Sequence, residues 1–111
     1  MKAICITLPA KIEWSDYEKE LAAVADGSQV MNFKVPFLPK EHCRRCYVAW
    51  RGEIIGWMTI CGTVSGHSFK CTTTGKGWDG KFIQRTGEFH YLPDPKPKMK
   101  GFQGWRYIEE I

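Results

Sequence analysis

Apolar and polar positions alternate with a period of two along most of the chain, a pattern that predicts short β-strands. Residues 2–7 form a first strand, which Leu8 and Pro9 end. Residues 29–35 alternate more loosely and stop at Pro36. Because proline lacks the N–H that a strand ladder needs, this segment is expected at a sheet edge. The last strand is predicted within residues 104–111.

One segment has a helical period instead, with apolar residues three and four positions apart on a single face. These residues are Tyr17, Leu21 and Val24. Ser15 is the predicted N-cap, and Glu18, three residues later, is its reciprocal partner in a capping box. Asp26-Gly27 is the predicted stop, since glycine accepts the positive φ that often ends a helix. The sequence therefore predicts one short amphipathic helix.

Two apolar runs, residues 46–50 and 54–61, are joined by a polar turn that contains Gly52. In the second run, Ile55, Trp57 and Thr59 are expected on one face, and Ile54, Met58 and Ile60 on the other. Both faces are largely apolar, so this hairpin is predicted to be central in its sheet. Trp57 is accordingly expected in the core.

Glycine, serine and threonine dominate residues 62–80, which predicts a loop there. Residues 81–85 and 88–92 read as another hairpin, turning near Thr86-Gly87, and residues 93–101 as a proline-punctuated basic loop. One helix among six or seven short strands predicts an α+β domain. Its sheet is expected to be a small, curled or closed, mixed β-barrel with the helix near the N-terminus.

The composition fits a single domain spanning residues 1–111, with 43% hydrophobic and 25% charged residues. Five tryptophans are more large rings than one small core needs, so some are expected to face a ligand or partner. The net charge of +4 permits an anionic partner. No apolar run approaches the roughly 20 residues of a membrane span. Five cysteines are an odd number, and reduced thiols in the cytoplasm are the expectation.

The order of elements, together with the segment YVAWRGEIIGW at residues 47–57, resembles the small PUA-like barrels, which include ASCH and EVE domains. The resemblance covers most of the chain in element order. It implies a pseudo-barrel with a cleft that binds RNA or a modified base, or that hydrolyses an acylated nucleoside in some ASCH members. ASCH enzymes usually carry a G-x-K-x-x-E type motif near the first helix. This chain has PAKIEWSDYEKE there, with no glycine two residues before Lys11, so no catalytic residue is transferred.

One set of cysteine and histidine spacings is compatible with a metal. Cys43 and Cys46 form a C-x-x-C pair, and His67 with Cys71 forms an H-x-x-x-C pair. Together they predict a Cys3His zinc site. The alternative is isolated buried thiols, since a strand points residues i and i+3 to opposite faces.

A second set is basic and aromatic, and lies mainly in KPKMKGFQGWRY near the C-terminus. Lysines there can follow phosphates while aromatic rings stack on unpaired bases. The candidate contact residues are Lys96, Lys98, Lys100, Trp105, Arg106, Arg44, Arg45, Trp50 and Trp78. Trp50 lies beside Arg51 and is expected at the rim, and Trp78 lies in a glycine-rich segment. The alternative is that the rings belong to the core and the lysines to a solvated edge.

These observations lead to three functional hypotheses. The first is a module that binds nucleic acid, or a modified base or nucleoside, in a basic and aromatic cleft near the central hairpin. The second is a protein-interaction or accessory domain whose surplus aromatic residues form a partner or homodimer interface. The third is an ASCH-type nucleoside amidohydrolase, for which the sequence assigns no catalytic residue. Salt dependence separates the first two, because counterion release weakens nucleic-acid binding as salt rises.

Overall fold

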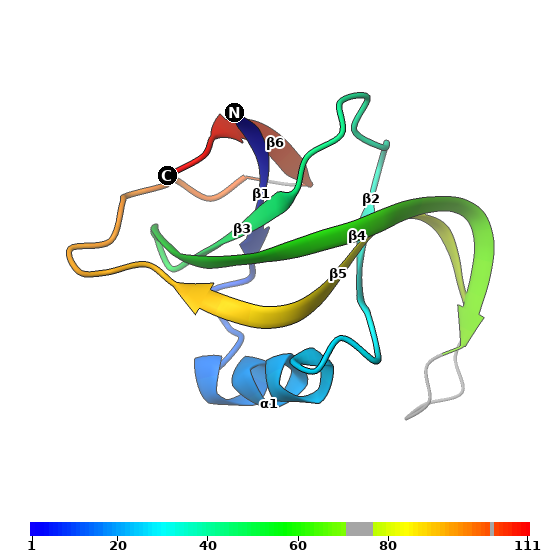
Figure 1. The fold of residues 1–111 in the computed structure, drawn as a ribbon, viewed down its shortest axis with the longest axis horizontal. Coiled ribbons are helices and arrows are strands. Elements are labelled where there is room, and N and C mark those ends of the chain that lie inside the picture. Colours follow the sequence, from blue (N-terminus) through cyan, green and yellow to red (C-terminus); the bar gives the residue numbers. More distant parts are fainter. Residues whose placement is uncertain (71–76, 103) are drawn as a thin grey trace.

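The computed structural model describes the backbone of residues 1–70, 77–102 and 104–111, and the side chains of these residues outside 66–70 and 77–79. The elements are β1 (Lys2–Leu8), α1 (Trp14–Val24), β2 (Met31–Val35), β3 (Arg45–Trp50), β4 (Glu53–Lys70), β5 (Gly77–Tyr91) and β6 (Trp105–Glu109). The strands form one six-stranded sheet in the order β2-β5-β4-β3-β1-β6 (Figure 1). The predicted edge position of β2 and central position of the β3–β4 hairpin are confirmed.

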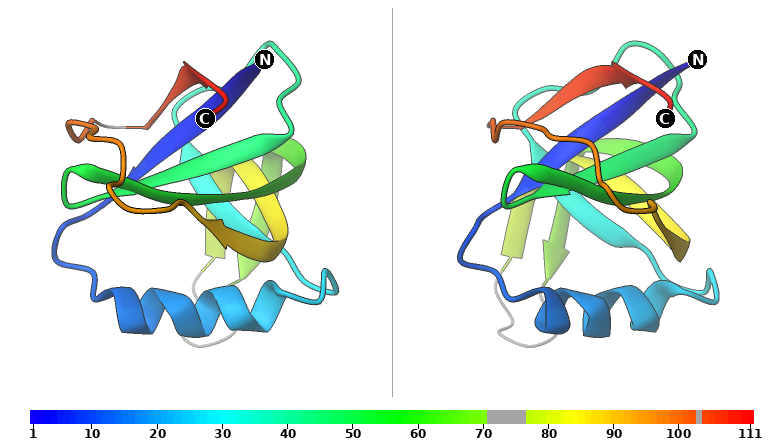
Figure 2. Two further views of the ribbon diagram at one scale, coloured as in Figure 1. Left: turned by 60° about the vertical axis from the view of Figure 1, so that its left-hand side comes forward. Right: turned by 90° about the vertical axis from the view of Figure 1, so that its left-hand side faces the viewer.

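The sheet is mixed and curls into a half-barrel (Figures 1 and 2). Strands β1 and β3 run parallel, whereas the other neighbours are antiparallel. Helix α1 lies across one side of the curl (Figure 2). Its predicted apolar face is buried against β-strand side chains. The expected α+β class, with a small curled sheet and one short helix, is confirmed. In the part of the chain that the structure describes, no helix is both long enough and apolar enough to cross a membrane.

The predicted capping box of α1 is wrong. The N-cap is Glu13, and its side chain makes no capping hydrogen bond. Trp14, the first residue of the helix, is held by tertiary contacts: its ring centroid lies 5.5 Å from that of Trp50, and its Nε1 donates to the Tyr91 hydroxyl at 3.1 Å. At the other end, the predicted stop is confirmed by Gly27, whose φ is +80°.

The β3–β4 turn has positive φ at both central residues, 49° at Arg51 and 83° at Gly52, as a type I′ hairpin turn requires. A register shift follows, because Val48 pairs with Gly56 whereas Ala49 pairs with Ile54. Residue 55 is therefore the extra residue of a β-bulge. The bulge places Ile54 on the side opposite Met58, so the prediction that these two share a face is wrong.

Two expected loops are strands instead. Strand β4 continues to Lys70 and β5 begins at Gly77, so most of residues 62–80 belongs to one long antiparallel pair. The turn predicted near Thr86-Gly87 is also absent. Gly87, with a φ of +85°, lies within β5 at a register shift, where the pairing changes from Thr59–Thr86 to Trp57–His90. The glycine thus accommodates a bulge, and the strand continues through it.

The two faces of the sheet have separate apolar clusters. The inner cluster lies under α1, and its fully buried members include Ile4, Ile6, Val48, Met58 and Ile83. The outer cluster is smaller and comprises Ala3, Cys5, Tyr47, Ala49 and Ile54. Side chains of the loop at residues 92–102 pack over the outer cluster. This loop therefore covers the outer cluster, as α1 covers the inner cluster.

Candidate nucleic-acid interface

A row of side chains crosses the outer face of the sheet, from β6 through β1, β3 and β4 to β5. Arg106 pairs with Cys5, Cys5 with Tyr47, Tyr47 with Trp57, and Trp57 with His90. Directly opposed residues on neighbouring strands project from the same face and lie within contact distance. We call the surface around this row the outer face. It lies on the side of the sheet away from α1.

Trp57 lies between two planar side chains on this face. The His90 ring stacks on the indole with centroids 4.1 Å apart and planes 21° from parallel. The Arg45 guanidinium lies 4.1 Å from the indole centroid. Since β4 runs between β3 and β5, the arginine and the histidine approach the indole from opposite flanks. An ion pair of Arg45 Nε with Glu110 at 3.0 Å fixes the guanidinium in this position.

The loop at residues 92–102 is attached to the β3–β4 turn beside this row (Figure 2). The Ile54 amide donates to the Pro97 carbonyl at 2.9 Å, and the Met99 amide donates to the Gly52 carbonyl at 3.0 Å. These bonds, with the packing of Phe102 on the outer cluster, hold the basic loop against the sheet. The lysines predicted to contact phosphates therefore lie at one edge of the outer face.

The cations of this edge differ in how they are paired. Lys98 pairs with Glu53 at 3.0 Å, and Lys96 with Asp94 at 2.8 Å. Within the described residues, Lys100 and Arg106 make no ion pair. Arg106 instead lies over the Phe102 ring, with its guanidinium carbon 4.2 Å from the centroid. Lys100 and Arg106 are thus the cations of this edge whose charge no neighbouring carboxylate offsets.

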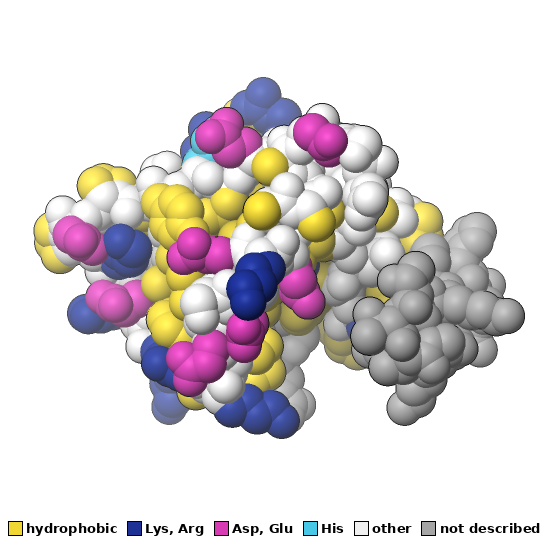
Figure 3. Space-filling view, turned by 90° about the horizontal axis from the view of Figure 1, so that it is seen from below, with side chains coloured by type: hydrophobic (Ala, Val, Ile, Leu, Met, Phe, Trp, Pro, Cys, Tyr) yellow, Lys and Arg dark blue, Asp and Glu magenta, His cyan; other side chains and the backbone are white. Residues whose placement is uncertain are grey.

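Charge is unevenly distributed between the helix and the rest of the chain. Residues 13–26 carry five of the twelve acidic residues and one of the sixteen basic ones. Acidic side chains accordingly gather over α1 in the space-filling view (Figure 3). The rest of the chain has fifteen basic residues against seven acidic ones. An anionic ligand is therefore repelled from the helix side and attracted elsewhere.

The structure does not bring all predicted contact residues to the outer face. Trp105 belongs to the periphery of the inner cluster, and its Nε1 donates to the Phe37 carbonyl at 2.8 Å. Trp50 also packs on the inner cluster and donates to the Ile12 carbonyl at 3.0 Å. Arg44 is exposed beside the N-terminus, with Nη2 3.5 Å from the Met1 sulfur. The side chain of Trp78 lies outside the described residues.

Sequence reasoning did not count two residues of the outer face, Trp57 and His90, among the contact residues. Trp57 was expected in the core, whereas it is half-buried and packs at the edge of the outer cluster. Period-two alternation showed which residues share a face within one strand. It did not show that a histidine far along the chain would be the cross-strand neighbour of this tryptophan. Only the pairing of β4 with β5 contains that information.

The predicted zinc ligands are distributed between described and undescribed parts of the chain. Cys43 precedes β3, so both Cys43 and Cys46 lie in the inner cluster, and the expectation that strand geometry separates them is wrong. Burial raises the pKa of Cys46 to about 11. The His67 side chain and Cys71 lie outside the described residues, in which no group of three or more metal-binding side chains occurs. The zinc site stays a prediction.

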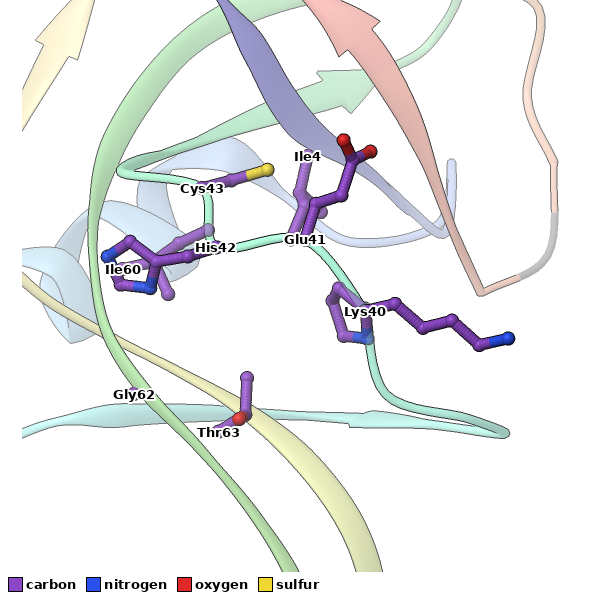
Figure 4. Close-up of a pocket in the computed structure, with 9 residues that line it drawn as sticks. Ile4, Lys40, Glu41, His42, Cys43, Ile60, Gly62 and Thr63 are labelled. Atoms are coloured by element: carbon purple, nitrogen blue, oxygen red, sulfur yellow. The ribbon is translucent and has the colours of Figure 1, made fainter.

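Cys43 also lines a recess of about 240 Å³ between the loop before β3 and strand β4 (Figure 4). Lys40, His42 and Thr63 contribute polar groups, and Ile4 and Ile60 contribute apolar ones. In Figure 4 the Cys43 sulfur and the His42 ring point to opposite sides. This arrangement does not direct the thiol and the imidazole to a common ligand.

No protein-family model matches this chain, and neither a curated protein nor a solved structure does. What the fold and the site define is an α+β half-barrel with an acidic helix on one side. Its outer face is basic and aromatic. Function must therefore be inferred from this geometry.

Proposed function

We propose that the protein is a small nucleic-acid-binding module that contacts unpaired bases with its outer face. The arrangement of Arg45, Trp57 and His90 is the main observation behind this proposal. Proteins that bind unpaired bases stack them on planar guanidinium and aromatic groups at a sheet surface. Each stacked base contributes roughly 1–3 kcal/mol to binding. Two cations without carboxylate partners, Lys100 and Arg106, lie on the same side and supply phosphate contacts.

The roles of the residues follow from their exposure. His90 is exposed, so a base stacks on the outward side of its ring while the indole of Trp57 supports the inward side. Arg45 is held by Glu110 and keeps the indole in place. Lys100 and Arg106 contact successive phosphates along the edge formed by the loop at residues 92–102. The acidic surface of α1 repels the backbone and so orients the strand.

We also propose that the fold is PUA-like. The half-barrel, and the single helix that follows the first strand, support this proposal. RNA, and a modified base or nucleoside, are the ligand classes that this resemblance implies. A cytoplasmic location belongs to the same proposal. Its support is the odd number of cysteines, of which Cys5, Cys43, Cys46 and Cys61 are free thiols in the described residues.

Fluorescence anisotropy with labelled single-stranded RNA, single-stranded DNA and duplex DNA tests the proposal. Between about 50 mM and about 200 mM salt, affinity for a single strand should fall steeply. Lys100→Ala and Arg106→Ala should each weaken binding and reduce the slope of log affinity against log salt by about 0.7. Lys19→Ala is the matched control, because Lys19 is an exposed lysine on α1.

Two results would contradict the proposal. One is the absence of binding to every probe at micromolar protein. The other is an equal effect of Lys19→Ala and Lys100→Ala, since the charge would then act without regard to face. Salt-independent self-association on sizing, with no nucleic-acid binding, would instead favour an aromatic protein interface.

A further inference from the structure

A groove of about 480 Å³ opens at the end of the outer face. Three segments that are distant in sequence enclose it: the end of β1 with the residues after it, the β3–β4 turn, and the end of the basic loop. Its lining includes Thr7, Leu8, Pro9, Arg51, Gly101 and Phe102. The groove therefore lies next to the two proposed phosphate contacts, Lys100 and Arg106, which neighbour Gly101 and Phe102 in sequence or in space.

The groove is lined by an aromatic ring and by Thr7, a residue whose hydroxyl has no hydrogen-bond partner. Phe102 lines it, whereas Arg106, which lies over the Phe102 ring, does not. The Thr7 hydroxyl is buried and has no hydrogen-bond partner. Thr7 is packed beneath Gly101, where an added Cβ would lie 3.6 Å from its methyl carbon. A ligand with an aromatic ring could stack on Phe102, and a polar group at the edge of that ring could hydrogen-bond on the Thr7 side.

Arg51 adds a cation to the groove at a position that is unfavourable for its backbone. The first central residue of a type I′ turn is usually asparagine, aspartate or glycine, because φ is positive there. Arg51 adopts a φ of 49°. Its side chain is held by three contacts: Nε donates to the Ala10 carbonyl at 2.9 Å, the guanidinium lies 4.2 Å from the Trp50 centroid, and Nη2 lies 3.6 Å from Glu13. These side-chain contacts offset the cost of placing an arginine at a position with positive φ.

We propose that this groove is a base subsite, which holds one unpaired base with its sugar. The base stacks against Phe102, and its polar edge is directed to the Thr7 side of the groove. Arg51 and Lys100 contact the phosphates on either side of that nucleotide. This inference rests on the proposed function and deepens it, because it assigns one position of the bound strand to a defined recess.

The test compares two probes that have the same phosphates. One is a single-stranded uridine oligonucleotide, and the other is an abasic oligonucleotide of equal length. The wild-type protein should bind the uridine probe about tenfold more tightly than the abasic probe, because at least one base stacks on the protein. Ala10→Leu narrows the groove from an exposed wall position, and Thr7→Val removes the hydroxyl at constant shape. Each should reduce the preference for the uridine probe several-fold and leave the salt slope unchanged.

Ala22→Leu is the control, since Ala22 is an exposed alanine on α1. Thermal unfolding of every variant verifies that the fold is retained. If Ala10→Leu and Thr7→Val keep the full preference for the uridine probe, the base subsite is overturned, while salt-dependent binding still supports the outer face. If the wild-type protein binds neither probe in a salt-dependent way, both the proposed function and the subsite are overturned.

Discussion

At the scale of single residues, Gly56 is the glycine of the described residues where an added side chain would meet its neighbours most closely. A Cβ added there would lie 2.6 Å from the Phe89 ring and would also clash with the His90 carbonyl. We predict that Gly56→Ala destabilises the protein by about 1–3 kcal/mol, because a rigid backbone group cannot move aside cheaply. Denaturant unfolding measures this change.

Gly62→Ala, also in β4, is the control for that prediction. Its Cβ would meet only the Gln84 side-chain oxygen, at an ordinary 3.5 Å. The two substitutions are chemically identical, so a similar loss of stability at both sites would contradict the steric explanation. Gly56 pairs with Tyr91, the residue next to His90, so Gly56→Ala should also weaken nucleic-acid binding.

The buried thiol of Cys5 should make the stability of the protein depend on pH. Burial, with a smaller contribution from the neighbouring Cys46 thiol, raises the pKa of Cys5 to about 12 from its ordinary 9.0. Above pH 9 the unfolded chain loses this proton while the folded protein keeps it. Stability should therefore fall as pH rises, by about 1 kcal/mol between pH 9 and pH 10 for this thiol.

Denaturant unfolding at several pH values, in reducing buffer, measures this loss. Cys5→Ala removes the titrating group and should remove that part of the pH dependence, whatever its effect on stability at pH 7. Tyr17, whose pKa burial also raises, adds a loss at higher pH that both proteins share. Equal slopes for the two proteins between pH 9 and pH 10 would contradict the account.

At the scale of elements, a buried arginine attaches α1 to the sheet. Arg85 on β5 is 2% exposed, and its Nη1 donates to the Tyr17 hydroxyl at 2.9 Å and contacts the Met58 sulfur at 3.8 Å. Its Nε is buried without a partner. Loss of the tyrosine hydroxyl would leave this charge still less compensated.

We predict that Tyr17→Phe destabilises the protein by about 1–3 kcal/mol, since it removes one of the few polar partners of a buried cation. In an Arg85→Met background the same change should cost much less, because no guanidinium is left to satisfy. Unfolding of the four proteins of this double-mutant cycle measures the coupling. Additive effects, with no coupling above about 0.5 kcal/mol, would contradict the attachment.

Which elements the sequence could predict depended on the range of the interactions that form them. Periodicity located α1 and its buried face, because Tyr17, Leu21 and Val24 are neighbours on one helix. It failed for the long β4–β5 pair, whose glycine, serine and threonine residues read as a loop. Pairing with the partner strand over its whole length outweighs those local preferences, and bulges absorb the glycines.

At the scale of the whole molecule, the sequence indicated which residue types gather on the candidate surface better than it indicated which residues lie there. The basic and aromatic C-terminal segment was recognised, and its lysines do lie beside the outer face. Trp105 and Trp50 were included with them, yet both pack on the inner side. The Trp57–His90 stack could not be predicted, because it forms only when two distant strands pair in one register.

Segregation of charge is also a property of the whole molecule. The net charge of +4 conceals an acidic helix and a more basic remainder. Sequence reasoning used the net value and the local charge of the C-terminal loop, but did not separate the acidic helix from the remainder of the chain. The acidic residues of α1 gather on the helix side of the molecule, and the remainder of the chain carries the basic excess.

The central claim is that the outer face stacks unpaired bases, and His90→Ala tests it most directly. His90 is exposed, so its removal takes away a stacking surface without opening the core. We predict that affinity for a single-stranded uridine oligonucleotide falls about tenfold, while the salt slope near pH 8 stays the same. His42→Ala, an exposed histidine in the loop before β3, is the control and should bind as the wild type does. Wild-type affinity in His90→Ala, or an equal loss in His42→Ala, would contradict the account.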